Sequence, residues 1–404
     1  MPETPFVVPE FIAFTLGMIV YFVGASLTRR IAFLRNFNIP EPVSGGLSAA
    51  VIVWLVYVFL GREITFELET RDVLLVIFFT TIGLNARMSD LIRGGRPLAL
   101  LLVLTIGFMV LQNVVGLIGV TSFGLPAASA VLVGSASLIG GHGTAIAWGP
   151  EIARTYGVEG AVEMGIAAAT LGLVLAALIG GPIAKFLIGR HKLEPRDEEA
   201  EPIVGLAHGS AKLADLDYIG FMRAMVTIHI AIILGYAANV WIADTGLRLP
   251  LFVPCLIIGI LIANVQSRLF PSAPVITGTP VLALISEFSL SVFLSMSLMS
   301  MQLWTLAALA GPLFAVLALQ VLMTVAFCIF VLFPVMGGTY RAAVLGAGFG
   351  GFALGATPTA IANMTAVTKR YGPSPLAFIV LPLVSAFFVD LANAFIIQFF
   401  VSLD

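Results

Sequence analysis

The chain has 404 residues, of which 10% are charged and 59% are hydrophobic, with 20 Lys and Arg against 22 Asp and Glu. A soluble domain carries about 25% charged residues, so a soluble globule of this size would lack the side chains needed to cover its surface. Disorder is excluded because it requires low hydrophobicity. A net charge of −2 argues against a nucleic-acid partner. The composition predicts an all-α polytopic protein embedded in a lipid bilayer.

Stretches without Asp, Glu, Lys or Arg predict ten transmembrane helices. In chain order they are 11–28, 43–60, 73–86, one within 97–150, 164–184, 224–243, 249–267, two within 288–340 joined near Gly311-Pro312, and 375–401, which alone carries a charged residue, Asp390. The run 97–150 is far longer than one span, because a helix crosses the hydrocarbon in about 20 residues. It therefore holds one span and a segment that turns back. The glycine-rich run 342–368 is predicted as a second such insert.

Basic residues are distributed unevenly between alternate loops. With the N-terminus outside, 16 Lys and Arg fall on the cytoplasmic side and four fall outside, namely Arg62, Arg71, Arg154 and Arg248. Because cytoplasmic loops are enriched in Lys and Arg, both termini are predicted to be periplasmic and the central loop cytoplasmic. The expected domains are a five-helix repeat in 1–190, a connecting loop in 191–217, and a second, inverted five-helix repeat in 218–404.

The chain resembles itself when Thr144 is aligned with Thr359. At this offset Thr144–Ala147 falls on Thr359–Ala362 and Tyr156-Gly157 falls on Tyr371-Gly372, so 6 of the 14 positions in 144–157 agree. Each half has an odd number of predicted spans, so the two halves must cross the membrane in opposite directions. Inverted repeats with irregular segments at matching positions are typical of secondary transporters.

Two glycine-rich segments lie at matching positions, 135–144 and 346–359. Irregular backbone at membrane depth is tolerated only where it is buried in protein or lines a wet cavity. We therefore expect two re-entrant hairpins whose tips meet near the midplane. Free N–H groups at helix N-termini suit a carboxylate, and carbonyl and hydroxyl oxygens suit a small hard cation. Alternatively, the glycines only allow helices to pack closely.

Five motifs resemble the bacterial sodium/glutamate symporters. They are Ile39–Leu47, Thr81–Ala86, Gly140–Thr144, Gly355–Met364 and Phe387–Ala394. The resemblance covers the chain from about Phe11 to Gln398. It implies sodium-driven L-glutamate uptake, with Na⁺ as the coupling ion and no other cofactor, in a homodimer of the bacterial inner membrane. It also implies kinship with the 2-hydroxycarboxylate symporters, in which a transport domain is thought to slide against a dimeric scaffold.

Glutamate carries two carboxylates and one ammonium, so its site must supply hydrogen-bond donors and at least one acceptor. The expected substrate site comprises Gly140, Gly141, His142, Gly143, Thr144, Gly355, Thr357, Thr359 and Asn363. For His142 two interpretations stay open. It either donates to a carboxylate or responds to protons, or it packs against a backbone carbonyl.

Sodium ligands are expected among Asp390, Asn393, Asn85 and Glu163. Asp390 lies well inside the last span, where a charge costs about 2.5–3.5 kcal/mol. Sodium coordination or pairing with the substrate ammonium would offset this cost, and the alternative is an ion pair with a basic residue. Asn393 lies three residues further on, hence on the same helical face.

Other function classes fit the sequence less well. A cation-coupled symporter of another small anion, such as a di- or tricarboxylate, is the nearest alternative. A channel is disfavoured because channels usually build a pore from symmetric subunits. A membrane enzyme would need a nucleophile–base set or metal-ligand spacing, and ATP-driven transport a phosphate-binding loop. None of these motifs occurs in the sequence.

Overall fold

The computed structural model describes residues 6–36, 39–86, 95–195, 218–244, 249–269, 276–306, 310–387 and 389–403. Most of the predicted connecting loop, 196–217, lies outside the described residues, as does Arg248. The long helices of the first half are α1 (Glu10–Arg30), α3 (Glu41–Leu60), α4 (Glu69–Asn85), α6 (Gly95–Ser122) and α8 (Ala161–His191). Those of the second half are α9 (Tyr218–Asp244), α10 (Phe252–Leu269), α11 (Pro280–Met299), α13 (Ala310–Phe327), α17 (Pro375–Phe387) and α18 (Val389–Val401). Shorter pieces are α2 (Ala32–Asn36), α12 (Leu303–Leu306) and the π-helical turn η4 (Cys328–Leu332).

The described helices confirm an all-α polytopic membrane protein. Seven are long and apolar enough to cross a membrane, and there are eight if the bent pair α17–α18 is counted as one span. Helices α4 and α10 coincide with the predicted third and seventh spans but are not among those eight. The count of ten spans therefore stays a prediction. The two spans expected near Gly311-Pro312 are separated there, since α11 ends at Met299 and α13 begins at Ala310. Gly311 and Pro312 themselves lie in the first turn of α13, where Pro is well tolerated.

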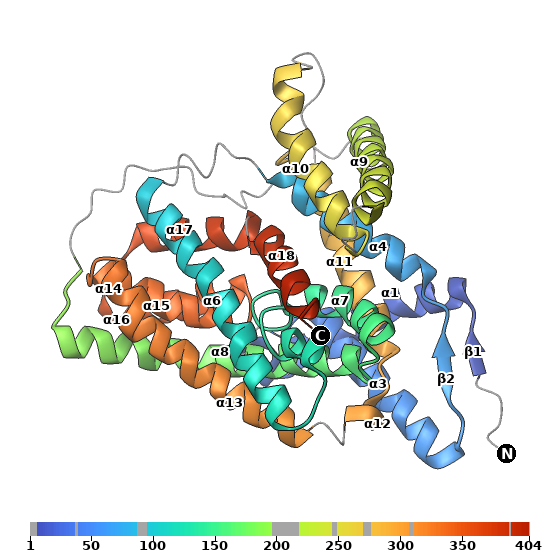
Figure 1. Ribbon diagram of the computed structural model, residues 1–404, viewed down its shortest axis with the longest axis horizontal. Helices are drawn as coiled ribbons and strands as arrows, with labels where there is room; N and C mark the ends of the chain where they lie inside the picture. Colours follow the sequence, from blue (N-terminus) through green and yellow to red (C-terminus); the bar gives the residue numbers. More distant parts are fainter. Residues whose placement is uncertain are drawn as a thin grey trace.

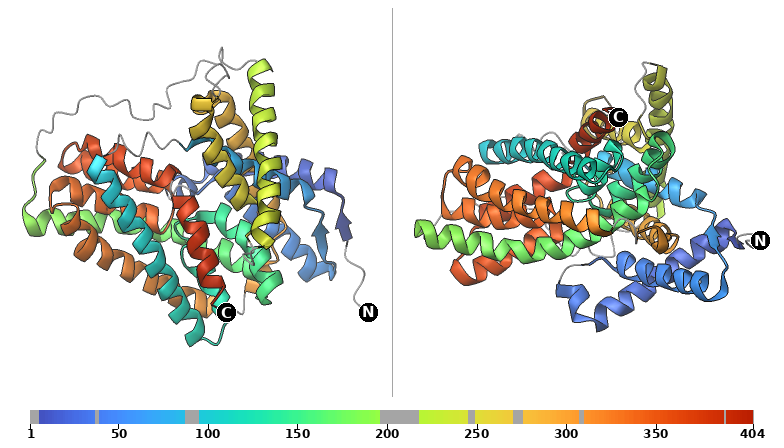
Figure 2. Two further views of the ribbon diagram at one scale, coloured as in Figure 1. Left: turned by 45° about the horizontal axis from the view of Figure 1, so that its top comes forward. Right: turned by 60° about the horizontal axis from the view of Figure 1, so that its bottom comes forward.

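The helices form two bundles, which Figures 1 and 2 show from three directions. The first bundle consists of α1, α3, α4, α9, α10 and α11, with α11 packed against α1, α3 and α4. The second bundle consists of α6, α8, α13 and its continuation α14 (Phe333–Val335), α17, α18 and two helical hairpins. Among the described residues the bundles touch along a few edges, such as α7 against α11 and α4 against α17.

The first hairpin consists of the 3₁₀ helix η1 (Ala127–Val133) and α7 (Gly141–Tyr156), joined by 134–140. The second consists of α15 (Tyr340–Ala353) and α16 (Thr357–Tyr371), joined by 354–356. The elements thus recur in the same order in both halves, and α7 and α16 end at Tyr156 and Tyr371, which the repeat aligns with each other. The opposite orientation of the halves stays a prediction.

The second glycine-rich segment was only partly as expected. Residues 346–353 are helical rather than irregular, and only 354–356 break the helix. A Cβ on Gly348 would lie 2.7 Å from Met364 Cγ, and one on Gly350 would lie 3.2 Å from Ile179 Cδ1. These glycines allow close helix packing, so the alternative interpretation holds for this arm.

Sequence patterns gave no sign of a small parallel sheet near the N-terminus. Strand β1 (Phe6–Val8) pairs with β2 (Ile64–Phe66). Directly after β1, α1 begins at Glu10. The Glu10 carboxylate accepts hydrogen bonds from the N–H groups of Glu69 and Thr70. An acid at the start of α4 complements the positive end of that helix, so the contact fastens α1 to α4.

Candidate functional site

A cavity of about 230 Å³ lies between the two bundles. The first bundle contributes mainly Phe78, Phe79, Leu290 and Leu294. From the second bundle come both hairpin tips, residues 139–144 and 355–357, together with Leu173, Phe352, Ser385 and Asp390. The tips are close together, because a Cβ on Gly141 would lie 3.9 Å from Gly355 O. Two segments far apart in the sequence therefore share one cavity.

Backbone N–H groups at the two tips supply unused hydrogen-bond donors. The N–H groups of residues 141–143 at the start of α7 have no acceptor among the described residues, and the same holds for Thr357 and Thr359 at the start of α16. We expected the N–H groups of Gly140 and Gly355 to be free as well, and this expectation was wrong. Their N–H groups already donate to Ser135 O and Phe352 O, at 2.9 and 3.3 Å. The donors thus come from the first helical turns, where N–H groups lack intrahelical partners.

Acceptors in the cavity come from side chains. Asp390 lines it and is half-buried. No Lys or Arg in the described part of the chain forms a salt bridge with Asp390, and none occurs among the lining residues. The expected alternative, an ion pair with a basic residue, is therefore not seen among the described residues. The cavity combines backbone donors with one carboxylate, and its described lining has no cationic side chain to balance it.

Two side-chain hydrogen bonds occupy equivalent positions in the two halves. His142 Nε2 lies 3.0 Å from Thr170 Oγ1, and Thr357 Oγ1 lies 2.9 Å from Ser385 Oγ. Thr170 and Ser385 were not among the residues predicted from the sequence. The repeat was the signal that relates them, since the offset that aligns Thr144 with Thr359 also carries His142 to Thr357 and Thr170 to Ser385.

Three predicted residues lie beside the cavity rather than in its lining. Asn363 Nδ2 donates to Ala176 O and Ala347 O, at 3.0 and 3.4 Å, and so joins α16 to α8 and α15. Asn393 Nδ2 donates to Ser135 O at 3.0 Å. Thr359 is fully buried, and its hydroxyl has no hydrogen-bond partner among the described residues. Asn363 and Asn393 therefore hold the hairpins in place.

Buried amides also satisfy the irregular backbone of the first hairpin. Asn113 Oδ1 accepts a hydrogen bond from Ser135 N–H at 2.8 Å. Gln320 Nε2 donates to Val133 O at 3.0 Å. Together with Asn393, these side chains replace the helical hydrogen bonds that residues 133–135 lack, which satisfies these backbone groups without water.

The structure does not bring Asn85 and Glu163, which were expected as sodium ligands, to the lining of the cavity. Asn85 Oδ1 accepts a hydrogen bond from Gly278 N–H at 3.0 Å, just before α11. Glu163 lies in the first turn of α8, and its carboxylate accepts from Gln302 N–H at 3.3 Å. An acid at that position is explained by the helix dipole.

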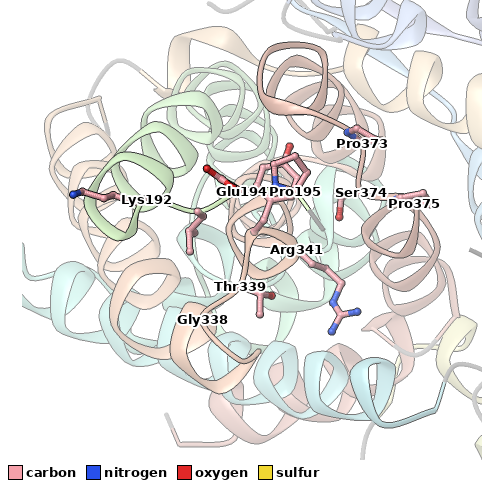
Figure 3. A pocket seen from close by; sticks show the side chains of 11 residues that line it. Lys192, Glu194, Pro195, Gly338, Thr339, Arg341, Pro373, Ser374 and Pro375 are labelled. Carbon is pink, nitrogen blue, oxygen red and sulfur yellow. The ribbon is translucent and has the colours of Figure 1, made fainter. Parts of the chain in front are cut away.

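A larger cavity of about 460 Å³ lies at the end of α8. Figure 3 shows its lining, which comes from the end of α8 and from the turns before α15 and α17. Lys192, Glu194 and Arg341 are among these residues. None of the predicted site residues lies there, so the smaller cavity between the bundles is the candidate site.

The fold and the cavity define a polytopic α-helical membrane protein with a site between two bundles that polar and apolar groups line together. The profile of the sodium/glutamate symporter family matches residues 9–373. The sodium/glutamate symporter of Haemophilus influenzae is 39% identical over 385 residues, 95% of both chains. Those of Escherichia coli and Shigella flexneri are 39% identical over 398 residues, 97% of this chain and 96% of theirs. The chain belongs to the sodium/glutamate symporter family, and it is a transport protein rather than an enzyme.

Proposed function

We propose that the chain imports L-glutamate together with sodium by alternating access. The observation that carries the proposal is the cavity between the bundles, because the first turns of two helices with unused N–H donors and one carboxylate all line it. Helix N-termini bind anions because their N–H groups and dipoles point outward. These donors bind the two carboxylates of glutamate.

Sodium binds at the oxygen-rich side of the same cavity. Asp390, Thr357 and Ser385 all contribute oxygen atoms there, and small hard cations prefer oxygen ligands. The Oδ1 atom of Asn393 is buried and has no hydrogen-bond partner among the described residues. It is therefore a further oxygen ligand for sodium next to these three residues. Since Asp390 and glutamate each carry one negative charge, at least one sodium ion accompanies the substrate.

The second bundle is the moving part in this proposal and the first bundle is the scaffold. Contacts between the bundles are fewer than contacts within each bundle, which supports an elevator-like movement of one bundle against the other. The equivalent pairs His142–Thr170 and Thr357–Ser385 support two inverted repeats of five spans, 1–190 and 218–404, joined by a cytoplasmic loop. In the proposed topology both termini are periplasmic, and the protein is a homodimer in the inner membrane.

A di- or tricarboxylate is the second candidate substrate. A tricarboxylate brings a charge of −3 at neutral pH into a cavity whose described lining holds a carboxylate and no Lys or Arg. Uncompensated charges of one sign are costly where the dielectric constant is low. The lining therefore favours the monoanionic amino acid.

The test is uptake of labelled glutamate into proteoliposomes with sodium, proton and voltage gradients imposed in turn. We expect uptake that requires an inward sodium gradient and is inhibited by unlabelled glutamate but not by citrate or malate. Uptake that follows a proton gradient without sodium would refute the coupling. Inhibition by citrate as strong as that by glutamate would refute the substrate.

A further inference from the structure

His142 is placed to recognise one particular group of the substrate. It is the second residue of α7, only 7% of its surface is exposed, and it lines the cavity between the bundles. Its Nε2 atom lies 3.0 Å from Thr170 Oγ1 on α8. The hydrogen bonds of Thr170 determine which nitrogen of the ring carries the proton.

The Thr170 hydroxyl has a single proton and two neighbours. Its oxygen lies 2.8 Å from Ile166 O, four residues earlier in α8. This is the usual O–H···O distance, and two oxygens this close repel each other unless a proton lies between them. The proton therefore goes to Ile166 O, and Thr170 accepts a hydrogen bond from His142 Nε2–H. A neutral imidazole carries only one N–H, so His142 Nδ1 presents a lone pair.

That lone pair is available to a ligand. His142 Nδ1 makes no hydrogen bond with any residue that the structure describes. It is also not among the fully buried polar atoms without a partner, so the atom keeps some accessible surface, and His142 lines the cavity. A hard cation such as sodium prefers oxygen ligands, whereas an ammonium group donates readily to an imidazole nitrogen.

We propose that His142 Nδ1 accepts a hydrogen bond from the α-ammonium group of the substrate. Thr170 is the positioning residue, because it holds the imidazole in the form protonated at Nε2. This inference rests on the proposed function and assigns the groups of the site. Backbone N–H groups bind the carboxylates, Asp390 and Thr357 bind sodium, and His142 distinguishes an amino acid from a plain dicarboxylate. It replaces the expectation that His142 donates to a carboxylate.

The test compares glutamate with glutarate, which has the same two carboxylates and no ammonium. Affinities are measured for the purified full-length protein at saturating sodium, by calorimetry and by inhibition of uptake. Loss of a hydrogen bond to a charged group corresponds to about a 10- to 100-fold change in affinity. We expect His142→Leu to weaken glutamate binding by that factor and to leave glutarate binding unchanged. His142→Asn, which keeps an acceptor near the Nδ1 position, should lose less than the Leu variant.

Thr170 supplies the matched pair of variants. Thr170→Val, which removes the acceptor for Nε2–H, should reduce the preference for glutamate over glutarate, and Thr170→Ser should restore it. An unchanged preference in both His142→Leu and Thr170→Val would overturn the inference. If one variant fails to fold, judged by its melting temperature in detergent, the other decides. Failure of the wild type to take up glutamate with sodium would instead refute the proposed function.

Discussion

The two hairpins occupy equivalent places in the fold but offer different chemistry to the cavity. The first has an irregular arm that buried amides hold in place, and its tip presents His142. The second has a regular helical arm, and its tip presents Thr357. At the same position in the two repeats, one hairpin therefore offers a nitrogen acceptor and the other an oxygen acceptor.

This difference shows how a repeated structure can bind two unlike ligands. The shared part is the helix N-terminus with its free N–H groups, which suits the carboxylates at either end of glutamate. The differing part is the side chain in the first turn of each helix. A nitrogen acceptor suits the substrate ammonium and oxygen acceptors suit sodium, so substitutions on the two sides should have separable effects on glutamate and sodium.

Asp390→Asn is expected to have the largest effect, on the sodium side. The substitution keeps the size of the side chain and removes the only carboxylate in the described cavity lining. The apparent sodium affinity should fall about 100-fold, as expected when a charged partner is lost. The measurement is uptake titrated with sodium at saturating glutamate, with Asp72→Asn, an exposed acid on α4, as control. A sodium titration like that of the wild type would exclude Asp390 as a ligand.

Gly141→Ala tests whether the space between the tips is the substrate site. Gly141 has φ +68° and its nearest neighbour across the cavity is Gly355 O. Gly157, at the other end of α7, has φ +64° and open space around it. Both alanine variants carry the same left-handed strain, roughly 1–2 kcal/mol. Only Gly141→Ala should lower uptake, about 30-fold if a further ~2 kcal/mol of binding is lost.

Melting temperatures of the two glycine variants provide the control. They should fall by similar amounts, since the strain is shared. Equal uptake by the two variants would mean that the gap between the tips does not hold the substrate.

Thr357→Val sharpens the comparison of the two hairpins. The variant keeps the shape of the side chain and removes the hydroxyl that bonds Ser385. We expect the sodium affinity to fall about tenfold, because one contact about as strong as a hydrogen bond is lost. The preference for glutamate over glutarate should stay unchanged. Thr365→Val on the same helix is the matched control, because its hydroxyl bonds its own helix at Ile361 O. A changed preference in Thr357→Val would show that the hairpins do not divide their ligands.

The sequence allowed the helices and the hairpin tips to be predicted because they depend on local patterns. Charge-free stretches marked the helices, and the alignment of Thr144 with Thr359 marked both tips. Thr170 and Ser385 were missed because a hydroxyl in an apolar helix usually bonds its own backbone, and only tertiary packing shows a second partner. The helical arm 346–353 was mistaken for irregular backbone, since glycine serves both turns and close helix packing.

Glu163→Gln should have the smallest effect, and it tests the boundary of the sodium site. The sequence made Glu163 a candidate ligand, whereas the structure places its carboxylate against Gln302 N–H, outside the cavity lining. Gln302 also bonds Glu63 through its amide nitrogen at 3.0 Å, so the contact links α8 with the loop after α3. The glutamine variant keeps an acceptor for Gln302, and we expect sodium affinity to stay within about twofold, because half-exposed polar contacts contribute little. A tenfold loss of sodium affinity would mean that a further sodium ion binds at this contact. The sodium site would then extend to the edge between the bundles.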